Sequence, residues 1–237
     1  MVRNDGRSFD QLRPVELIPS YLELHPASCL VKMGRTWVLC AASVEEKVPP
    51  FLEGKGQGWV TAEYAMLPAS TDRRTPRERQ AGGRSQEISR LIGRCLRASV
   101  DMKSMGQRTI TVDCDVLQAD GGTRTASVTG GYVALALALR RLGSQGMLRA
   151  NPLRKAVAAV SAGVVDGELL LDLDYSEDSH ADADLNVAMN EEGDLVDVQG
   201  TAEGYPFAQT ALQQLLGLTR KGIGELLEEQ RRALSSR

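Results

Sequence analysis

The sequence has no long hydrophobic run, no closely spaced cysteines and few aromatic residues, and each absence excludes a class of protein. No apolar stretch of the 237 residues approaches the roughly 18 that a membrane-spanning helix needs, so we expect no membrane span. The first residues, MVRNDGR, lack the apolar segment of a signal peptide, which favours a cytoplasmic protein. The four cysteines contain no C-x-x-C pair, so we expect buried free thiols rather than a metal site or a disulfide framework.

The net charge of −3 does not indicate a nucleic-acid-binding protein, but the charges are unevenly distributed. Residues 72–108 contain ten Lys and Arg, nine of them Arg, against four acidic residues. Residues 156–219 contain thirteen acidic residues and no Lys or Arg. This asymmetry predicts a basic surface for a polyanion and a separate group of carboxylates that could hold a cation. The alternative is that the two regions neutralise each other across an interface.

The hydrophobic pattern predicts hairpins followed by helices, twice along the chain. Its elements are a hairpin in 15–43 that turns at 33–35, a polar loop 70–85, a helix 86–100, a strand 108–120, a helix ending near 142, hairpins turning at 166–167 and 192–193, and helices 206–218 and 223–234. No low-complexity linker divides the chain. The sequence therefore predicts a mixed α/β (α+β) fold, with residues 1–237 in one compact domain of two related halves.

A glycine-rich stretch, Gly121-Gly122-Thr123-Arg124, lies between the predicted strand and the long helix. A helix N-terminus presents unpaired N–H groups, glycine lets an anion approach the backbone, and arginine can grip two oxygens. The spacing is neither that of a Walker loop nor that of a dinucleotide-binding motif. The stretch favours a small anion such as phosphate; the alternative is a tight turn that uses glycine for its geometry alone.

Six carboxylates follow within thirteen residues: Asp172, Asp174, Glu177, Asp178, Asp182 and Asp184. On a continuous strand, Asp178 and Asp184 would be roughly 20 Å apart. If the chain turns near Ala181, their Cβ atoms come within about 5 Å. The turned arrangement would suit Mg²⁺ or Mn²⁺ held by these carboxylates and by phosphate oxygens. A solvated acidic turn is the alternative.

Five stretches in colinear order between residues 4 and 204 resemble the ribonuclease PH family: NDGRSFDQLRPVEL, GWVTAEYAMLPAST, GGRSQEISRLIGRCLRASV, RTITVDCDVLQADGGTRTASVTGG and DLDYSEDSHADADLNVAM. Members are phosphate-dependent 3′-to-5′ exoribonucleases acting on tRNA precursors. The resemblance implies a fold of two βαβα halves and a homohexamer built as a trimer of dimers. It implies inorganic phosphate bound by Arg84, Gly122, Thr123 and Arg124, and a catalytic, metal-linked role for Asp178 and Asp184. The resemblance also implies that the reaction releases nucleoside 5′-diphosphates and is reversible, so that nucleotides can be added to RNA 3′ ends.

Several arginines are candidates for binding RNA phosphates. In the polar loop these are Arg73, Arg74, Arg77 and Arg79. Arg90, Arg94 and Arg97 share one helix face and are as well explained by intersubunit ion pairs. The chain has Ala69 where family members usually carry arginine, a place that Arg73 or Arg74 could fill. With aromatics at 4% of the chain, Trp59 and Tyr64 are better explained by packing than by base stacking.

Two other function classes compete with phosphorolysis. The first is a non-catalytic ring subunit that binds RNA passively, for which intact phosphate and aspartate motifs would have no use. The second is a hydrolytic nuclease using water and the same metal, which would leave the glycine-arginine anion site without a role.

Overall fold

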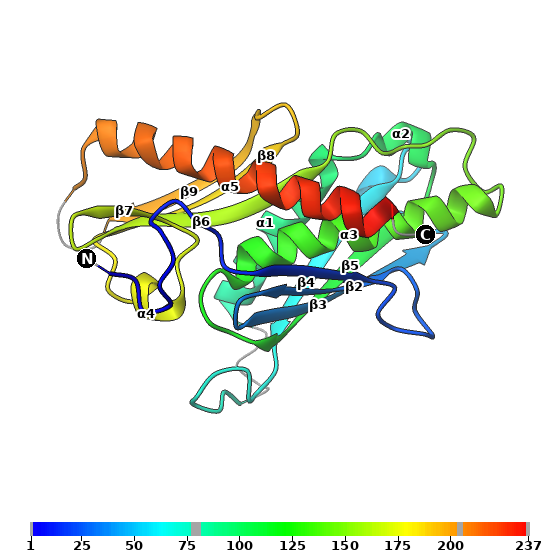
Figure 1. The fold of residues 1–237 in the computed structure, drawn as a ribbon. Coiled ribbons are helices and arrows are strands. Elements are labelled where there is room, and N and C mark those ends of the chain that lie inside the picture. The colour runs from blue at the N-terminus through cyan, green and yellow to red at the C-terminus, as the bar shows by residue number, and fades with distance from the viewer. Residues whose placement is uncertain (1, 77–81, 203–205, 236–237) are drawn as a thin grey trace.

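In a computed structural model, which describes residues 2–76, 82–202 and 206–235, two β-sheets pack around helices (Figure 1). The first sheet has the order β1-β2-β3-β5-β4 and is built from β1 (Val15–Pro19), β2 (Ser28–Met33), β3 (Thr36–Glu45), β4 (Trp59–Met66) and β5 (Thr109–Gln118). Its helices are η1 (Pro50–Leu52), α1 (Gly83–Ala98), α2 (Met102–Met105) and α3 (Thr123–Ser144). β4 and β5 are parallel and joined through α1, whereas the other pairs are antiparallel.

The second sheet has the order β7-β6-β8-β9, with all pairs antiparallel. Its strands are β6 (Val157–Val165), β7 (Glu168–Leu171), β8 (Ala183–Asn190) and β9 (Leu195–Ala202), and its helices are α4 (Tyr175–Asp178) and α5 (Gln209–Ser235). The mixed fold in two halves and the three hairpin turns are confirmed. No helix in the described ranges is both long and apolar enough to cross a membrane.

Two boundaries predicted from the sequence are wrong. The two C-terminal helices are one helix, α5, that continues through Gly222. A Cβ there would lie 3.0 Å from Leu171 and 3.1 Å from Leu12, so this glycine serves close packing rather than helix termination. Helix α1 begins at Gly83, three residues before the predicted start, and therefore includes Arg84 in its first turn.

Helix α3 is buried along most of its length because it contacts both the first sheet and β6 (Figure 1). Gly130 makes the closest approach: a Cβ on it would lie 2.7 Å from Val31 Cγ2 and 3.1 Å from Cys40 Sγ. The four cysteines are free and buried, as predicted. Burial raises the pKa of Cys29 to about 12, so this thiol stays protonated at neutral pH.

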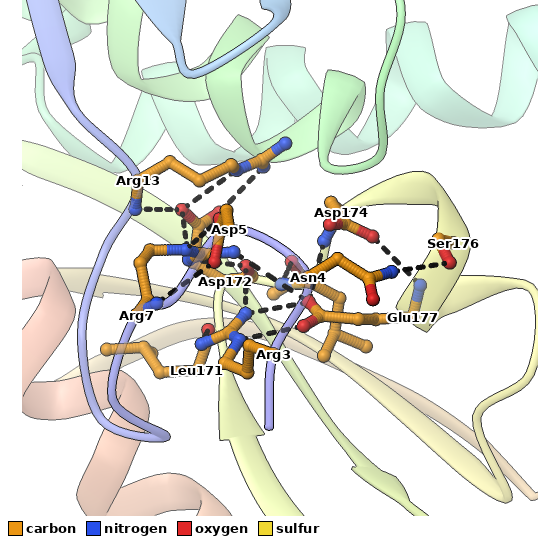
Figure 2. Close-up of polar contacts among 12 residues, drawn as sticks. Arg3, Asn4, Asp5, Arg7, Arg13, Leu171, Asp172, Asp174, Ser176 and Glu177 are labelled. Carbon is orange, nitrogen blue, oxygen red and sulfur yellow. Dashed lines mark hydrogen bonds and ion pairs between the residues drawn. The ribbon is translucent and has the colours of Figure 1, made fainter. Parts of the chain in front are cut away.

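The N-terminal segment, residues 2–13, runs from the second half to the first (Figure 1) and carries three buried arginines. The Arg3 guanidinium donates to both carboxylate oxygens of Glu177, at 2.7 Å each. It also donates to the backbone carbonyls of Leu171 and Asp172 (Figure 2). Because Glu177 belongs to α4, this buried ion pair holds that helix to the start of the chain.

The second buried ion pair joins Arg13 to Asp172 (Figure 2). Arg13 Nε and Nη2 donate to the two carboxylate oxygens at 3.0 and 2.7 Å, and the Arg13 backbone N–H donates to the same carboxylate at 2.8 Å. Arg7 adds a hydrogen bond to the Asp172 carbonyl. Paired charges remain stable in a protein interior when hydrogen bonds satisfy them this completely. The two halves are therefore joined by polar contacts as well as by the apolar core.

The close approach of α3 predicts opposite effects for two Gly→Ala substitutions. Gly130→Ala is expected to destabilise the protein by about 1–3 kcal/mol because the new methyl group overpacks against Val31 and Cys40. Gly224→Ala, at an exposed α5 position with nothing within 4 Å, should instead stabilise it by up to about 1 kcal/mol through helix propensity. Urea unfolding measures both values, and equal effects would contradict close packing at Gly130.

The Arg3–Glu177 pair predicts a large loss of stability when one partner is removed. Arg3→Met leaves the buried Glu177 carboxylate without its bidentate partner and with only the more distant Arg7 at 3.8 Å, which should cost about 3–5 kcal/mol. The double variant with Glu177→Gln should recover part of that loss. Lys221→Met, which breaks an exposed pair with Asp10, should cost less than about 1 kcal/mol. Urea unfolding that found similar losses for Arg3→Met and Lys221→Met would contradict the structural role of the buried pair.

Candidate functional site

A large open cleft of about 1620 Å³ lies between the two halves. The first half lines it with residues 69–73, the start of α1 and the turn between β5 and α3. The second half contributes α4 and parts of β8 and β9. The residues expected to bind phosphate and the two carboxylates expected to be metal-linked all line this cleft: Arg84, Gly122, Thr123, Arg124, Asp178 and Asp184. The fold thus brings together groups that lie up to 100 residues apart in the sequence.

The glycine turn, residues 120–122, presents the N-terminus of α3 to the cleft. Gly121 and Gly122 have φ angles of +74° and +65°, in the left-handed region that favours glycine. Gly122 is the N-cap, and no side chain caps the helix. The first N–H groups of α3 have no partner within the helix, so an anion in the cleft can accept from them. The Thr123 hydroxyl lies 2.8 Å from the Tyr64 hydroxyl, so Tyr64 orients Thr123 as well as packing in the core.

Gly121 also brings the turn into direct contact with the second half. A Cβ at this position would lie 2.6 Å from the Leu173 carbonyl oxygen and 2.7 Å from the Asp174 carbonyl carbon. The backbone N–H of Tyr175 donates to Asp120 Oδ1 at 3.4 Å. The anion-binding turn and the start of α4 therefore form one packed unit.

Two arginines flank the turn. Arg84 lies in the first turn of α1, on the cleft wall, where its guanidinium is exposed. Arg124 follows the turn and donates to Gln199 Oε1 of β9 at 3.3 Å, and it lies 3.8 Å from Glu87. Both guanidinium groups act electrostatically on Asp178 across the cleft and favour its ionised form. Positive charge is thus concentrated where two phosphate groups could meet.

Asp178 and Asp184 face the same cleft because the chain turns between them. Asp178 is the last residue of α4 and Asp184 lies on β8, so the continuous strand is wrong and the chain does turn between them. The two are not opposite partners of a strand pair, because Asp178 belongs to a helix and Asp184 pairs with Gly163 and Thr201. Although the Asp178 side chain is open to solvent, the cleft wall partly desolvates it. That desolvation, followed by the nearby Asp184 charge, raises the Asp178 pKa above its usual value despite the arginines.

The rest of the acidic stretch has structural roles that the sequence did not reveal. Asp172 and Glu177 are buried and bind arginines of the N-terminal segment. Asp174 is the N-cap of α4 and forms a capping box with Glu177, for which the D-x-x-E spacing was an available signal. The arginine partners are 159 and 174 residues away, so no local pattern could have identified them.

The carboxylates in the cleft fit a hard divalent cation that shares its coordination with a bound ligand. Within residues 2–76, 82–202 and 206–235, no group of three or more His, Cys, Asp or Glu is arranged to hold a metal by itself. Two carboxylates beside an anion site match the way Mg²⁺ binds, through one or two carboxylates together with phosphate oxygens. The donor set therefore fits Mg²⁺ or Mn²⁺ and does not form an all-protein cage.

The arginines predicted to bind RNA differ in their position relative to the cleft. Arg73 lines the cleft beside Ala69, whereas Arg74 is exposed and is not among the described cleft-lining residues. Arg77 and Arg79 lie outside the described residues.

The stripe on α1 makes contacts within its own chain. Arg94 Nε donates to Asp197 at 2.7 Å, and the Arg97 guanidinium lies 4.4 Å from the centre of the Trp59 ring. Trp59 also packs edge-on against Phe51, in agreement with the predicted packing role. The Arg94–Asp197 pair joins the basic and the acidic regions, as the neutralising alternative anticipated. Only Arg90 of this stripe has an exposed position without such a described contact.

Comparisons with known proteins agree with this geometry. Two models of the 3′ exoribonuclease family match the chain, domain 1 over residues 11–140 and domain 2 over residues 155–222. Two solved structures share the fold. The Archaeoglobus fulgidus exosome with RNA bound to its active site has a TM-score of 0.81 at 23% identity, covering 96% of this chain and 92% of its own. Rice Rrp46 has a TM-score of 0.80 at 18% identity, covering 99% and 100%.

Sequence relatives are much more similar. Ribonuclease PH of Neisseria meningitidis serogroup C (strain FAM18) is 57% identical over 234 residues, which is 98% of this chain and 97% of the relative. Ribonuclease PH of Neisseria gonorrhoeae (strain NCCP11945) is 58% identical over 233 residues, 97% and 96%. That of Syntrophomonas wolfei is 54% identical over 237 residues, 99% of each chain. The chain therefore belongs to the ribonuclease PH family of 3′ exoribonucleases.

Proposed function

We propose that the cleft between the halves shortens RNA from its 3′ end, with inorganic phosphate bound at the glycine turn as the nucleophile. Family membership supplies the reaction class: the chain is a phosphorolytic 3′-to-5′ exoribonuclease of tRNA processing and a nucleotidyltransferase. One observation supports these residue roles: a single cleft holds an uncapped helix N-terminus, two arginines and two carboxylates.

The phosphate would occupy the N-terminus of α3. Backbone N–H groups there, the Thr123 hydroxyl and the guanidinium groups of Arg84 and Arg124 offer donors and positive charge. Phosphorolysis requires two anions, the free phosphate and the last phosphodiester, to approach each other. Fixed donors and cations in a cleft lower the cost of that approach without reorganising during the reaction.

The reaction balances without an oxidant or a nucleotide cofactor. A phosphate oxygen forms a bond to the terminal phosphorus, and the bond from that phosphorus to the preceding 3′ oxygen breaks. The products are a nucleoside 5′-diphosphate and an RNA shorter by one nucleotide. One anhydride bond replaces one diester bond, so the step is reversible and nucleotides can be added to RNA 3′ ends.

The departing 3′ oxygen needs a proton, and we assign its donor to Asp178, the cleft carboxylate whose pKa the cleft wall and the Asp184 charge raise. Its raised pKa keeps a larger protonated fraction than an ordinary aspartate has. Asp184, together with Asp178 when that group is ionised, would hold Mg²⁺ or Mn²⁺. When bound, the cation would neutralise charge on the phosphate oxygens.

Further parts of the proposal rest on family membership alone. They are tRNA precursors as preferred substrates, a cytoplasmic homohexamer, and RNA backbone contacts by Arg73, Arg74, Arg77 and Arg79. Arg73 has the additional support of its place in the cleft beside Ala69. Of the rival functions, the passive ring subunit is disfavoured by the enzyme relatives, and hydrolysis is disfavoured because water does not require an anion site.

Arg84→Ala is expected to raise the KM for inorganic phosphate about 10- to 100-fold, the equivalent of one or two lost charge-assisted hydrogen bonds. The substrate would be a tRNA with a short 3′ extension, and the released nucleotides would be identified with and without phosphate. Arg90→Ala, an exposed arginine further along α1, is the matched control and should behave like the parent. Monophosphates released without phosphate would indicate hydrolysis, and RNA binding without any release would indicate a passive subunit.

Asp178→Asn is expected to slow phosphorolysis by about 100-fold or more, since proton transfer is lost. Without metal at neutral pH it should also raise the melting temperature slightly, because a disfavoured carboxylate charge is removed. The folded pKa is raised, so ionisation destabilises the parent above that pKa, and the difference should vanish below about pH 4.

Mg²⁺ provides the second readout for Asp178. It should raise the melting temperature of the parent more than that of Asp178→Asn, because binding to the native state stabilises it. Equal Mg²⁺ shifts in both proteins would contradict a metal-linked role for this carboxylate.

A further inference from the structure

The glycine turn is held from beneath by two residues that the reaction itself does not require. Neither Arg13 nor Thr36 is among the described residues that line the cleft. Both are buried, Thr36 completely and Arg13 to all but 3% of its surface. They nevertheless make the polar contacts that determine where the turn lies.

Thr36, the first residue of β3, binds backbone groups of two successive residues of the turn. Its hydroxyl donates to the Gly121 carbonyl at 2.6 Å and accepts from the Asp120 N–H at 2.9 Å. Gly121 and Asp120 are not part of a helix or strand, so these bonds replace those that regular structure would provide. One buried hydroxyl thus satisfies both groups and limits how the turn can shift.

Arg13 connects the same turn to the second half. Two of its nitrogens bind Asp172, and its third, Nη1, donates to the Asp120 carbonyl (Figure 2 shows the Asp172 contacts). A Cβ on Gly122 would lie 2.9 Å from Arg13 Nη2, so the turn rests directly on the guanidinium. On its other side, the aliphatic part of Arg13 packs against Gly34, where a Cβ would lie 2.8 Å from Cδ.

The hairpin between β2 and β3 completes this support. Gln118, at the end of β5, donates to the Arg35 carbonyl at 2.7 Å, immediately before Thr36. The turn therefore has an anchor on each side: the hairpin at residues 34–36 and the buried Arg13–Asp172 pair. Above it, the N–H groups of α3 face the cleft.

We infer that Thr36 and Arg13 are positioning residues for the nucleophile: they hold the glycine turn where the N-terminus of α3 meets inorganic phosphate. The inference rests on the proposed function, because it assigns the turn to phosphate rather than to RNA. When either residue is replaced, the turn keeps its own residues but loses hydrogen bonds that fix its position. A displacement of the order of 1 Å is enough to weaken binding and rate substantially.

Thr36→Val tests this directly, since valine has nearly the same shape but lacks the hydroxyl. We expect the KM for inorganic phosphate to rise about 10-fold while the KM for RNA stays within about 2-fold of the parent. Thr36→Ser, which keeps the hydroxyl, should restore the parent value. Thr109→Val is the matched control: it removes a hydroxyl with comparable burial, bonded to the Lys47 carbonyl, from the opposite end of β5.

A second measurement does not depend on activity. The rise in melting temperature produced by inorganic phosphate reports binding to the native state. Thr36→Val should need about 10-fold more phosphate than the parent for the same rise, whereas Thr109→Val should not. Arg13→Lys keeps a charge beside Asp172 but loses the fork that also reaches Asp120, so it should shift the phosphate requirement in the same direction.

The outcomes separate this inference from the proposed function. If Arg84→Ala raises the phosphate requirement and Thr36→Val changes only stability, as Thr109→Val does, the positioning role is wrong and the phosphate site stands. If the parent shows no dependence on phosphate, the proposed function fails and the inference fails with it.

Discussion

The buried ion pair between Arg13 and Asp172 is the interaction on which the active cleft depends. Both side chains are almost completely removed from water, so each charge is stable only while the other is present. The pair joins the first residues of the chain to the loop that precedes α4. It also lies directly beneath the glycine turn. A single ion pair therefore relates the glycine turn of the first half to the carboxylates of the second.

The buried arginines account for part of the acidic stretch between residues 172 and 184, whose described carboxylates form no metal-holding group of three. Asp172 and Glu177 neutralise buried arginines, Asp174 caps a short helix, and Asp178 and Asp184 remain to face the cleft. Helix α4 spans only four residues, too short to be stable without tertiary contacts. Its capping box and the Arg3–Glu177 pair provide the missing stabilisation. The cleft-facing carboxylate at its end, Asp178, is consequently held in place by buried groups elsewhere in the chain.

The distribution of charge around the cleft matches a reaction between two anions. Arg84, Arg124 and the N-terminus of α3 lie on one wall, and two carboxylates lie on the other. Excess positive charge alone would bind phosphate but leave no group to protonate the departing oxygen. Excess negative charge alone would repel both reactants. The raised pKa of Asp178 results from its crowded wall and from Asp184, against the opposing effect of the arginines.

Local chemistry was sufficient for much of this protein to be predicted from its sequence. Periodicity and turn residues located the hairpins and the main helices. The glycine-threonine-arginine stretch predicted a helix N-terminus, which the structure places at the cleft, and its use as an anion site stays a prediction. Motif order indicated the family. The sequence analysis divided α5 into helices 206–218 and 223–234, whereas Gly222 lies inside one helix and packs against Leu171 and Leu12, far away in the chain.

Only the tertiary structure decided which carboxylates are structural and which are functional. Asp172 and Asp178 are the same residue type and lie six positions apart, yet Asp172 is buried against Arg13 and Asp178 faces the cleft. That difference depends on partners about 160 residues away. The same holds for Thr36, whose hydroxyl acquires a role only when β3 and β5 pair and bring the glycine turn against it. Sequence determined the chemical groups, and long-range packing determined what each one touches.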